Sequence, residues 1–76
     1  MKRRLPALKP SAVLRALKRG GFVIHHVSGS HYILKHPEKP KLRITLAYHN
    51  RDLKRRTLDS VLEQAGLSQE EFIDLL

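Results

Sequence analysis

Cysteine is absent from this sequence of 76 residues, so disulfide bonds and thiolate metal sites are excluded. Its absence also agrees with a reducing compartment. Long apolar runs are lacking too: the basic start, Met1 to Arg4, resembles that of a signal peptide, but Pro6, Lys9 and Pro10 interrupt the stretch that follows. No segment approaches the length of a membrane-spanning helix. We therefore expect a soluble cytoplasmic protein that does not associate with membranes.

Basic residues are missing from the last twenty positions, which contain five acidic side chains. The first twenty positions show the opposite pattern, with seven lysines and arginines and no acid. Residues 21–56 add eight basic residues against Glu38 and Asp52, and the formal net charge of the chain is +8. Because the positive charge is concentrated in the first two-thirds of the chain, we expect a polyanionic partner there. Nucleic acid explains this segregation better than solubility alone.

The chain is long enough for one small domain, which we place at residues 1–76. A first helix begins at Pro10, where a missing N–H costs nothing, or alternatively at Ser11. Apolar residues recur at helical spacing through residues 13–17, and the pair Gly20-Gly21 ends the helix.

The C-terminal quarter predicts two helices. Thr57 is a good N-cap for the first of them, and Gly66 ends it. Ser68 and Glu71 have the spacing of a capping box for a short last helix. A helix-turn-helix that reads DNA is the alternative interpretation, but the acidic last helix would be repelled by DNA phosphates. We therefore expect this segment to cover the core.

Three strand-like runs lie between the helices, at 22–27, 31–35 and 42–46. Phe22 and Ile24 share one face of the first run, and Tyr32 and Leu34 share one face of the second. Both pairs can reach the same core only if an odd number of residues connects the runs. We therefore predict a three-residue loop, Ser28-Gly29-Ser30, with Gly29 left-handed and bulged.

This register places Val27 opposite His31 and His25 opposite Ile33. His25 and His26 then point to opposite faces, so they cannot bind one metal ion together, and we predict no metal site and no cofactor. The sheet face that points away from the core is predicted to carry Val23, His25, Val27, His31, Ile33, Lys35, Arg43 and Thr45.

The predicted order is helix, three-stranded antiparallel meander, helix and short helix, which is a fold of the α+β class. The segment Pro37-Glu38-Lys39-Pro40 forms the second turn of the meander. Amphipathic helices must cover the apolar face of such a sheet. We therefore expect all helices on one face and an open face on the other side.

His31 is the leading candidate for a catalytic group. It directly follows Gly29 and Ser30, a turn at which a ligand can approach the backbone closely. It shares its predicted face with Lys35 and Arg43, and an imidazole beside cations suits general-base chemistry on a phosphate ester. The alternative is an inert histidine on a strand surface.

Positive charge clusters again before the second long helix. Lys54, Arg55 and Arg56 precede Thr57, where free N–H groups and the helix dipole favour a phosphate. The first helix extends this basic surface with Arg15, Lys18 and Arg19. We predict that RNA is bound by Gly29, Ser30, Lys35, Arg43, Lys54, Arg55, Arg56 and Thr57.

Five short motifs are spaced along the chain: Gly20-Gly21-Phe22, Gly29-Ser30-His31, His49, Thr57-Leu58 and Gln64-Ala65-Gly66-Leu67. Together they resemble the HicA (YcfA-like) family of toxin mRNA interferases over nearly the whole chain. The most specific part is Gly-Phe followed, seven residues after Phe, by Gly-Ser-His. Two positions differ from the family pattern: Ala47 stands where proline is frequent, and Arg56 where glycine is frequent.

The resemblance implies a double-stranded-RNA-binding-like α-β-β-β-α fold, here with a short extra C-terminal helix. It also implies ribosome-independent cleavage of mRNA by His31 and a cognate HicB antitoxin that blocks the site. On this interpretation His31 removes the proton of a 2′-OH, while Lys35 and Arg43 stabilise charge on the phosphate. The leaving group would be protonated by His25 or His49.

Partners and oligomeric state follow from the same interpretation. Val23, Val27 and Ile33 form a predicted apolar patch beside His31, and such patches mark partner sites. We expect an HicB-like antitoxin to cover this patch, and the free toxin to be a monomer or a weak homodimer. A non-catalytic double-stranded-RNA-binding module is the alternative function, because the basic surface alone is enough for it.

Overall fold

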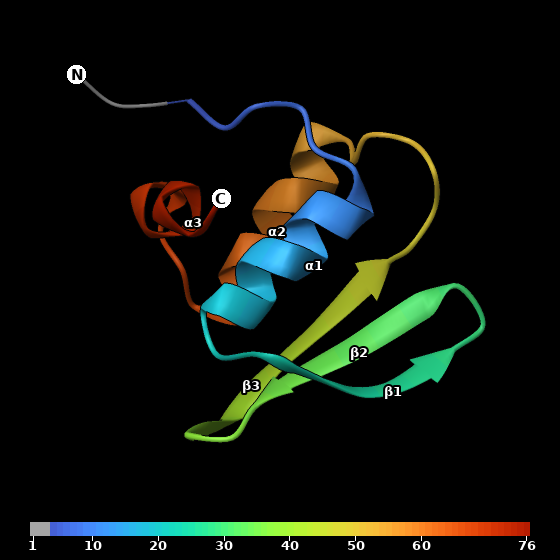
Figure 1. Cartoon of the computed structure of the whole chain (residues 1–76), viewed down its shortest axis with the longest axis vertical. Helices are drawn as coiled ribbons and strands as arrows, with labels where there is room; N and C mark the ends of the chain where they lie inside the picture. Colours follow the sequence, from blue (N-terminus) through green and yellow to red (C-terminus); the bar gives the residue numbers. More distant parts are fainter. Residues whose placement is uncertain (1–3) are drawn as a thin grey trace.

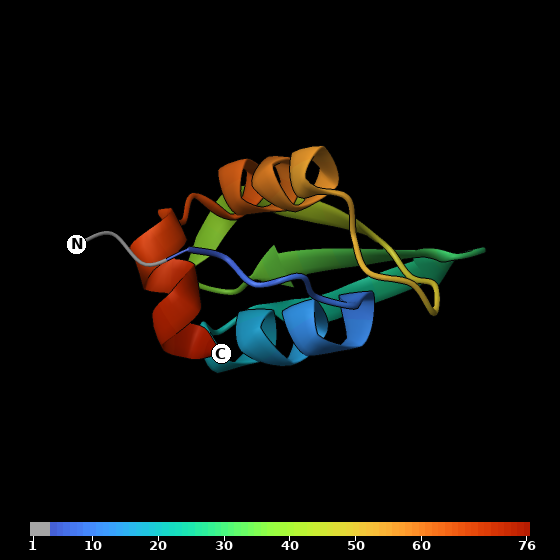
Figure 2. The same ribbon diagram turned by 90° about the horizontal axis from the view of Figure 1, so that it is seen from above.

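The computed structural model describes residues 4–76, so the basic start before Arg4 lies outside the described residues. The elements are α1 (Pro10–Arg19), β1 (Val23–Ser28), β2 (His31–His36), β3 (Lys39–Ala47), α2 (Arg55–Ala65) and α3 (Gln69–Leu75). The three strands form one antiparallel sheet in the order β1-β2-β3. α1 and α2 lie side by side over one face of the sheet, and no helix of residues 4–76 covers the other face (Figures 1 and 2). The predicted α+β, double-stranded-RNA-binding-like fold is confirmed.

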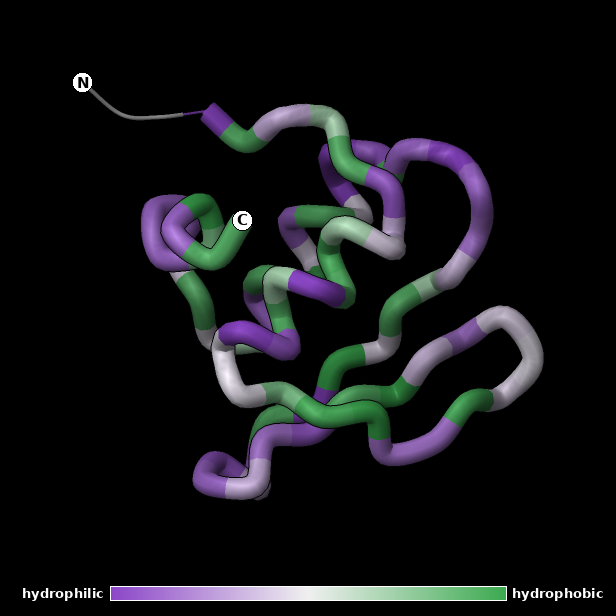
Figure 3. The backbone as a smooth tube through the Cα atoms, viewed as in Figure 1, coloured by the Kyte–Doolittle hydropathy of each residue, from purple (hydrophilic) through white to green (hydrophobic). Residues whose placement is uncertain are grey.

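The core lies between the sheet and the helices. Its largest fully buried side chains come from all three helices and from β2 and β3: Val13, Leu17, Leu34, Ile44, Leu46, Val61 and Phe72. The chain alternates between hydrophobic and hydrophilic along β3, whereas the loop between β3 and α2 is mostly hydrophilic (Figure 3). Between residues 4 and 76, no helix has the length and apolar character needed to span a membrane.

α1 begins at Pro10, with Lys9 as its N-cap, so the first of the two predicted starts is confirmed. The buried stripe of α1 faces the sheet and α2. At the other end of the helix, the Arg19 guanidinium donates a hydrogen bond to the carbonyl of Leu75 over 2.9 Å. This bond attaches α3 to α1, and α3 closes that end of the molecule (Figure 1).

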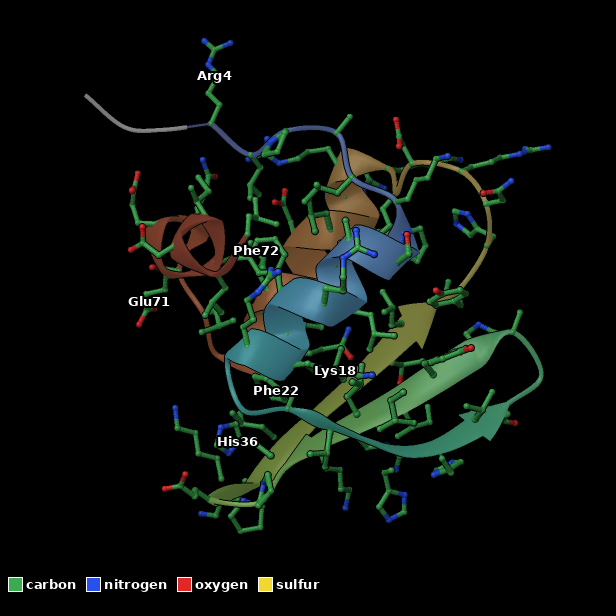
Figure 4. All side chains as sticks on the ribbon, viewed as in Figure 1. Arg4, Lys18, Phe22, His36, Glu71 and Phe72 are labelled. Carbon is green, nitrogen blue, oxygen red and sulfur yellow. The ribbon has the colours of Figure 1, made fainter. Side chains whose placement is uncertain are left out.

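His36 is the last residue of β2 and is only 8% exposed. Its Nε2 lies 3.1 Å from the carbonyl oxygen of Gly20, and its Nδ1 accepts a hydrogen bond from the backbone N–H of Glu38 over 3.1 Å. Its ring meets Phe22 edge to face, with centroids 5.0 Å apart (Figure 4). His36 therefore joins the end of α1 to the β2–β3 turn.

The β1–β2 hairpin differs from the predicted register. Its loop has two residues, Gly29 and Ser30, because Ser28 pairs with His31. Gly29 is left-handed, as predicted, with φ of 58°. The register shifts between Ile24 and His26, so the bulged residue is His25 rather than Gly29. The bulge supplies the odd residue that keeps Ile24 on the same face as Leu34, its partner across the strands.

The bulge changes which side chains share the uncovered face. His26 lies opposite Ile33, whereas Val27 lies opposite Tyr32 and faces the helix side. The predicted positions of His25 and Val27 are therefore wrong, because the parity of β1 reverses at the bulge. In the observed register the uncovered face carries Val23, His26, Ser28, His31, Ile33, Lys35, Arg43, Thr45 and Ala47.

α2 begins at Arg55 with Lys54 as N-cap, and Thr57 lies inside the first turn, so the predicted cap is wrong. The earlier start has a physical reason. Arg55 Nε pairs with Asp59 one turn along the helix over 3.0 Å, and its Nη2 donates to Gln69 over 3.0 Å. These contacts stabilise an additional helical turn before Thr57. The end at Gly66 is confirmed, with φ of 69°.

The capping box of α3 is confirmed. The backbone N–H of Ser68 donates to Glu71 Oε1 over 2.8 Å, and the Glu71 N–H donates to Ser68 Oγ over 3.1 Å. The backbone hydrogen bond from Ser68, followed by its side-chain bond, lowers the pKa of Glu71 below the usual 4.5. Glu71 lies at the surface, while Phe72 points from α3 into the core (Figure 4).

We expect replacing Glu71 with Gln to make stability less sensitive to acid. Because the folded pKa is lowered, the stabilisation by the Glu71 carboxylate is fully present above about pH 4.5 and is lost as the pH falls through the folded value. Glu71→Gln keeps a hydrogen-bond acceptor but does not titrate. Urea unfolding should give a higher free energy of unfolding for the wild type than for the variant at pH 7. The two values should converge below pH 4. A constant difference between them at all pH values would contradict this assignment.

Candidate functional site

His31 is exposed at the first position of β2, on the uncovered face of the sheet. Its partners across the neighbouring strands are Ser28 and Ala47. The turn before it is fixed from the other side, because the Tyr48 N–H donates to the carbonyl oxygen of Ser30 over 2.7 Å. The Gly-Ser-His turn is thus tied to the end of β3, and its histidine faces solvent.

A cavity of about 650 Å³ opens beside this end of the sheet. It begins at Ala47, the cross-strand partner of His31, and continues under the loop to the start of α2. Its lining is formed by Ala47, His49, Arg51, Asp52, Leu53, Lys54 and Thr57. Two of the predicted RNA-binding residues, Lys54 and Thr57, therefore lie in one concave site next to His31, together with a second cation, Arg51.

Lys35 and Arg43 lie opposite one another on β2 and β3, on the same face as His31. Lys35 is four residues along the strand from His31, which corresponds to about 13 Å at the rise of a β-strand. This spacing favours contacts of the histidine and the two cations with different phosphates of one chain laid along the sheet.

The remaining basic residues near α2 differ in what they contact. Lys54 lines the cavity, and Arg56 is exposed beyond it. The Arg55 guanidinium instead bonds to Asp59 and Gln69. Arg51 is not among the predicted residues, because it lies in a loop without a periodic pattern and only the folded loop brings it to the cavity.

Two stacked tyrosines lie at the end of the sheet, next to the loop that follows β3. The rings of Tyr32 and Tyr48 stack with centroids 4.4 Å apart and an interplanar angle of 19°. Both are half-buried and pack against the core. This stack, with the Tyr48–Ser30 hydrogen bond, keeps the His31 turn and the cavity in a fixed relative position.

The other histidines near His31 fall into two sets. His25 and His26 are neighbours on the bulge, with their Nδ1 atoms 2.7 Å apart, so the prediction that they point to opposite faces is wrong. His49 Nδ1 accepts a hydrogen bond from the Arg51 N–H over 3.1 Å. Within residues 4–76, no group of three or more histidine or carboxylate side chains is arranged to hold a metal ion.

We expect Lys54→Ala to weaken RNA binding more than Arg55→Ala does. Lys54 is directed to the cavity, so its loss should lower affinity and reduce the slope of log affinity against log salt by about 1. Arg55→Ala removes an exposed ion pair, which is worth at most about 1 kcal/mol of stability. Fluorescence anisotropy with a labelled RNA at several salt concentrations compares the two variants. Equal losses would show that Arg55 leaves Asp59 to contact RNA.

The order α-β-β-β-α and an antiparallel sheet with both long helices on one face are those of the double-stranded-RNA-binding-like class of small α+β domains. Residues 11–67 of the chain match the model of a family described as the HicA toxin of bacterial toxin–antitoxin systems. The match covers most of the chain, so the protein belongs to the HicA toxin family. It includes His31, the cavity and the cations Lys35, Arg43, Arg51, Lys54, Arg55 and Arg56, whereas α3 lies beyond it. No curated protein matches the sequence.

Proposed function

We propose that the protein is a metal-independent endoribonuclease that cleaves mRNA, with His31 as the general base. The observation that carries this proposal is the position of His31: exposed, on the uncovered sheet face, and next to a cavity with two cations. Membership of a toxin family adds support, because destruction of mRNA is a direct way to stop growth.

The chemistry uses a nucleophile that RNA itself provides. His31 takes the proton of the 2′-OH next to the scissile phosphate, so that the 2′-oxygen attacks phosphorus. Arg51 and Lys54, which line the adjoining cavity, stabilise the charge that develops on the phosphate oxygens. Lys35 and Arg43 hold the RNA backbone further along the sheet. The products are a 2′,3′-cyclic phosphate and a 5′-OH.

An HicB-like antitoxin is the proposed inhibitor. The predicted apolar patch is not present on the uncovered face, because Val27 faces the helix side and Ile33 is only 5% exposed. Val23 is 48% exposed there. A partner that covers this face would bury Val23 and block His31 together. The net charge of +8 favours an acidic partner, which would also compete with RNA.

Wild-type protein tests the proposal directly. We expect it to cut single-stranded RNA in the presence of excess EDTA, and we expect the fragments to carry 2′,3′-cyclic phosphates, which acid or phosphatase treatment distinguishes from simple phosphates. The reason is that neither the nucleophile nor the base is a metal-bound water. Loss of cleavage in EDTA that returns with added Mg²⁺ would contradict the mechanism. Binding of RNA without cleavage would support the non-catalytic module instead.

A further inference from the structure

A second imidazole, that of His26, lies close to His31. His26 pairs with Ile33, and His31 is two residues from Ile33 on the same strand and the same face. Residues in this diagonal relation on an antiparallel pair are roughly 7–8 Å apart. A phosphodiester fits between two side chains at that separation, with each imidazole within hydrogen-bond reach of a different oxygen.

We propose that His26 is the general acid that protonates the leaving 5′-oxygen, and that His25 is its positioning residue. This inference rests on the proposed ribonuclease function and completes it. Base catalysis by His31 alone leaves the departing alkoxide without a proton. The bulge decides which histidine takes this place. With Ile24 opposite Leu34, a strand without the bulge would put His25 opposite Ile33 and turn His26 to the helix side of the sheet.

The contact between the two neighbouring histidines suits an acid. Their Nδ1 atoms are 2.7 Å apart, and their ring centroids are 5.0 Å apart at an interplanar angle of 74°. A hydrogen bond at this distance needs one proton between the two nitrogens. When His26 is the imidazolium, its Nδ1–H donates to His25 Nδ1 in a charge-assisted bond, and its Nε2–H stays available to the substrate.

His49 is the rival for this role, since it lines the cavity on the other side of His31. Its Nδ1 already accepts a hydrogen bond from the Arg51 N–H over 3.1 Å. A proton on that atom would face a second N–H group, so the observed bond belongs to the neutral ring. A neutral imidazole is a poor proton donor, and His26 is therefore the better general acid.

The complete step balances protons and bonds. His31 accepts the 2′-OH proton as the 2′-oxygen bonds to phosphorus. The bond from phosphorus to the 5′-oxygen breaks, and His26 Nε2 gives its proton to that oxygen. The step ends with a 2′,3′-cyclic phosphate, a 5′-OH, a protonated His31 and a neutral His26. Because His25, His26 and His31 are all exposed, exchange with water restores the starting protonation states.

The leaving group itself provides the test. The cleavage site of a short RNA is first mapped with the wild-type protein. The same RNA is then made with sulfur in place of the bridging 5′-oxygen at that site, because a thiolate departs without being protonated. His26→Ala should slow cleavage of the oxygen substrate about 100-fold or more, but cleavage of the sulfur substrate less than tenfold. His31→Ala should slow both, and His25→Ala should give a weaker form of the His26→Ala pattern.

Each other outcome is decisive. Equal losses on both substrates for His26→Ala would overturn the inference, because a structural defect does not depend on the leaving group. The sulfur-selective pattern in His49→Ala, and not in His26→Ala, would overturn it and assign the acid to His49. If the wild-type protein cuts neither RNA, the proposed ribonuclease function is wrong, and so is the assignment of a general acid. If it cuts both, and only His31→Ala is impaired, the ribonuclease stands and His26 has no catalytic role.

Discussion

Replacing His31 with Ala should reduce RNA cleavage by about 10²–10⁴-fold while leaving RNA affinity close to that of the wild type. In the proposed mechanism the imidazole removes the 2′-OH proton, whereas affinity depends on the many cations of the surface. His31 is exposed at the start of β2, so its removal creates no cavity and should hardly change stability. Expression of the variant should no longer stop bacterial growth.

Two measurements separate this result from loss of the fold or of binding. Anisotropy with a fluorescent RNA should give a similar affinity and a similar salt slope for wild type and His31→Ala, and circular dichroism should give similar melting curves. Retained cleavage by the variant would assign the base to another group. A parallel loss of affinity and cleavage would make His31 a binding residue rather than a catalytic one.

The arrangement of helices and strands was predictable because each signal for it is local. The apolar stripe of α1, the alternation along β3 and the Ser68–Glu71 box each need only a few neighbouring residues. Parity also predicted that Ile24 and Leu34 share a face. It could not tell whether the odd residue lies in the turn or in the strand, because a three-residue loop and a bulge at His25 satisfy the same condition.

The site was harder to predict because it depends on residues that are distant in sequence. His31 follows from a local motif, but the neighbouring cavity exists only once the loop after β3 folds back, with the Leu53 N–H bonded to the carbonyl oxygen of Leu8 over 2.7 Å. Arg51 is brought to the cavity in this way. In the same way, the first turn of α2 is supported by the bond from Arg55 to Gln69, fourteen residues along the chain.

Replacing Gly21 with Ala should destabilise the protein by about 3–5 kcal/mol, a large part of the 5–15 kcal/mol typical of a folded domain. Gly21 has φ of 95°, a conformation that strains any residue with a Cβ. The added Cβ would also lie 2.6 Å from His36 Nε2. The ring can escape only by giving up its contacts with the Gly20 carbonyl, the Glu38 N–H and Phe22. Urea denaturation measures the loss.

Gly29→Ala is the matched control, because Gly29 is also left-handed, with φ of 58°, but has no atom within 4 Å of an added Cβ. This variant should lose only the free energy that a left-handed backbone costs an alanine, about 1–2 kcal/mol. The difference between the two variants isolates the collision with His36. Removing the ring as well, in Gly21→Ala/His36→Ala, should therefore cost clearly less than the sum of the two single changes. Additive losses would mean that the ring and the glycine are independent, and that His36 does not lock the end of α1 to β2.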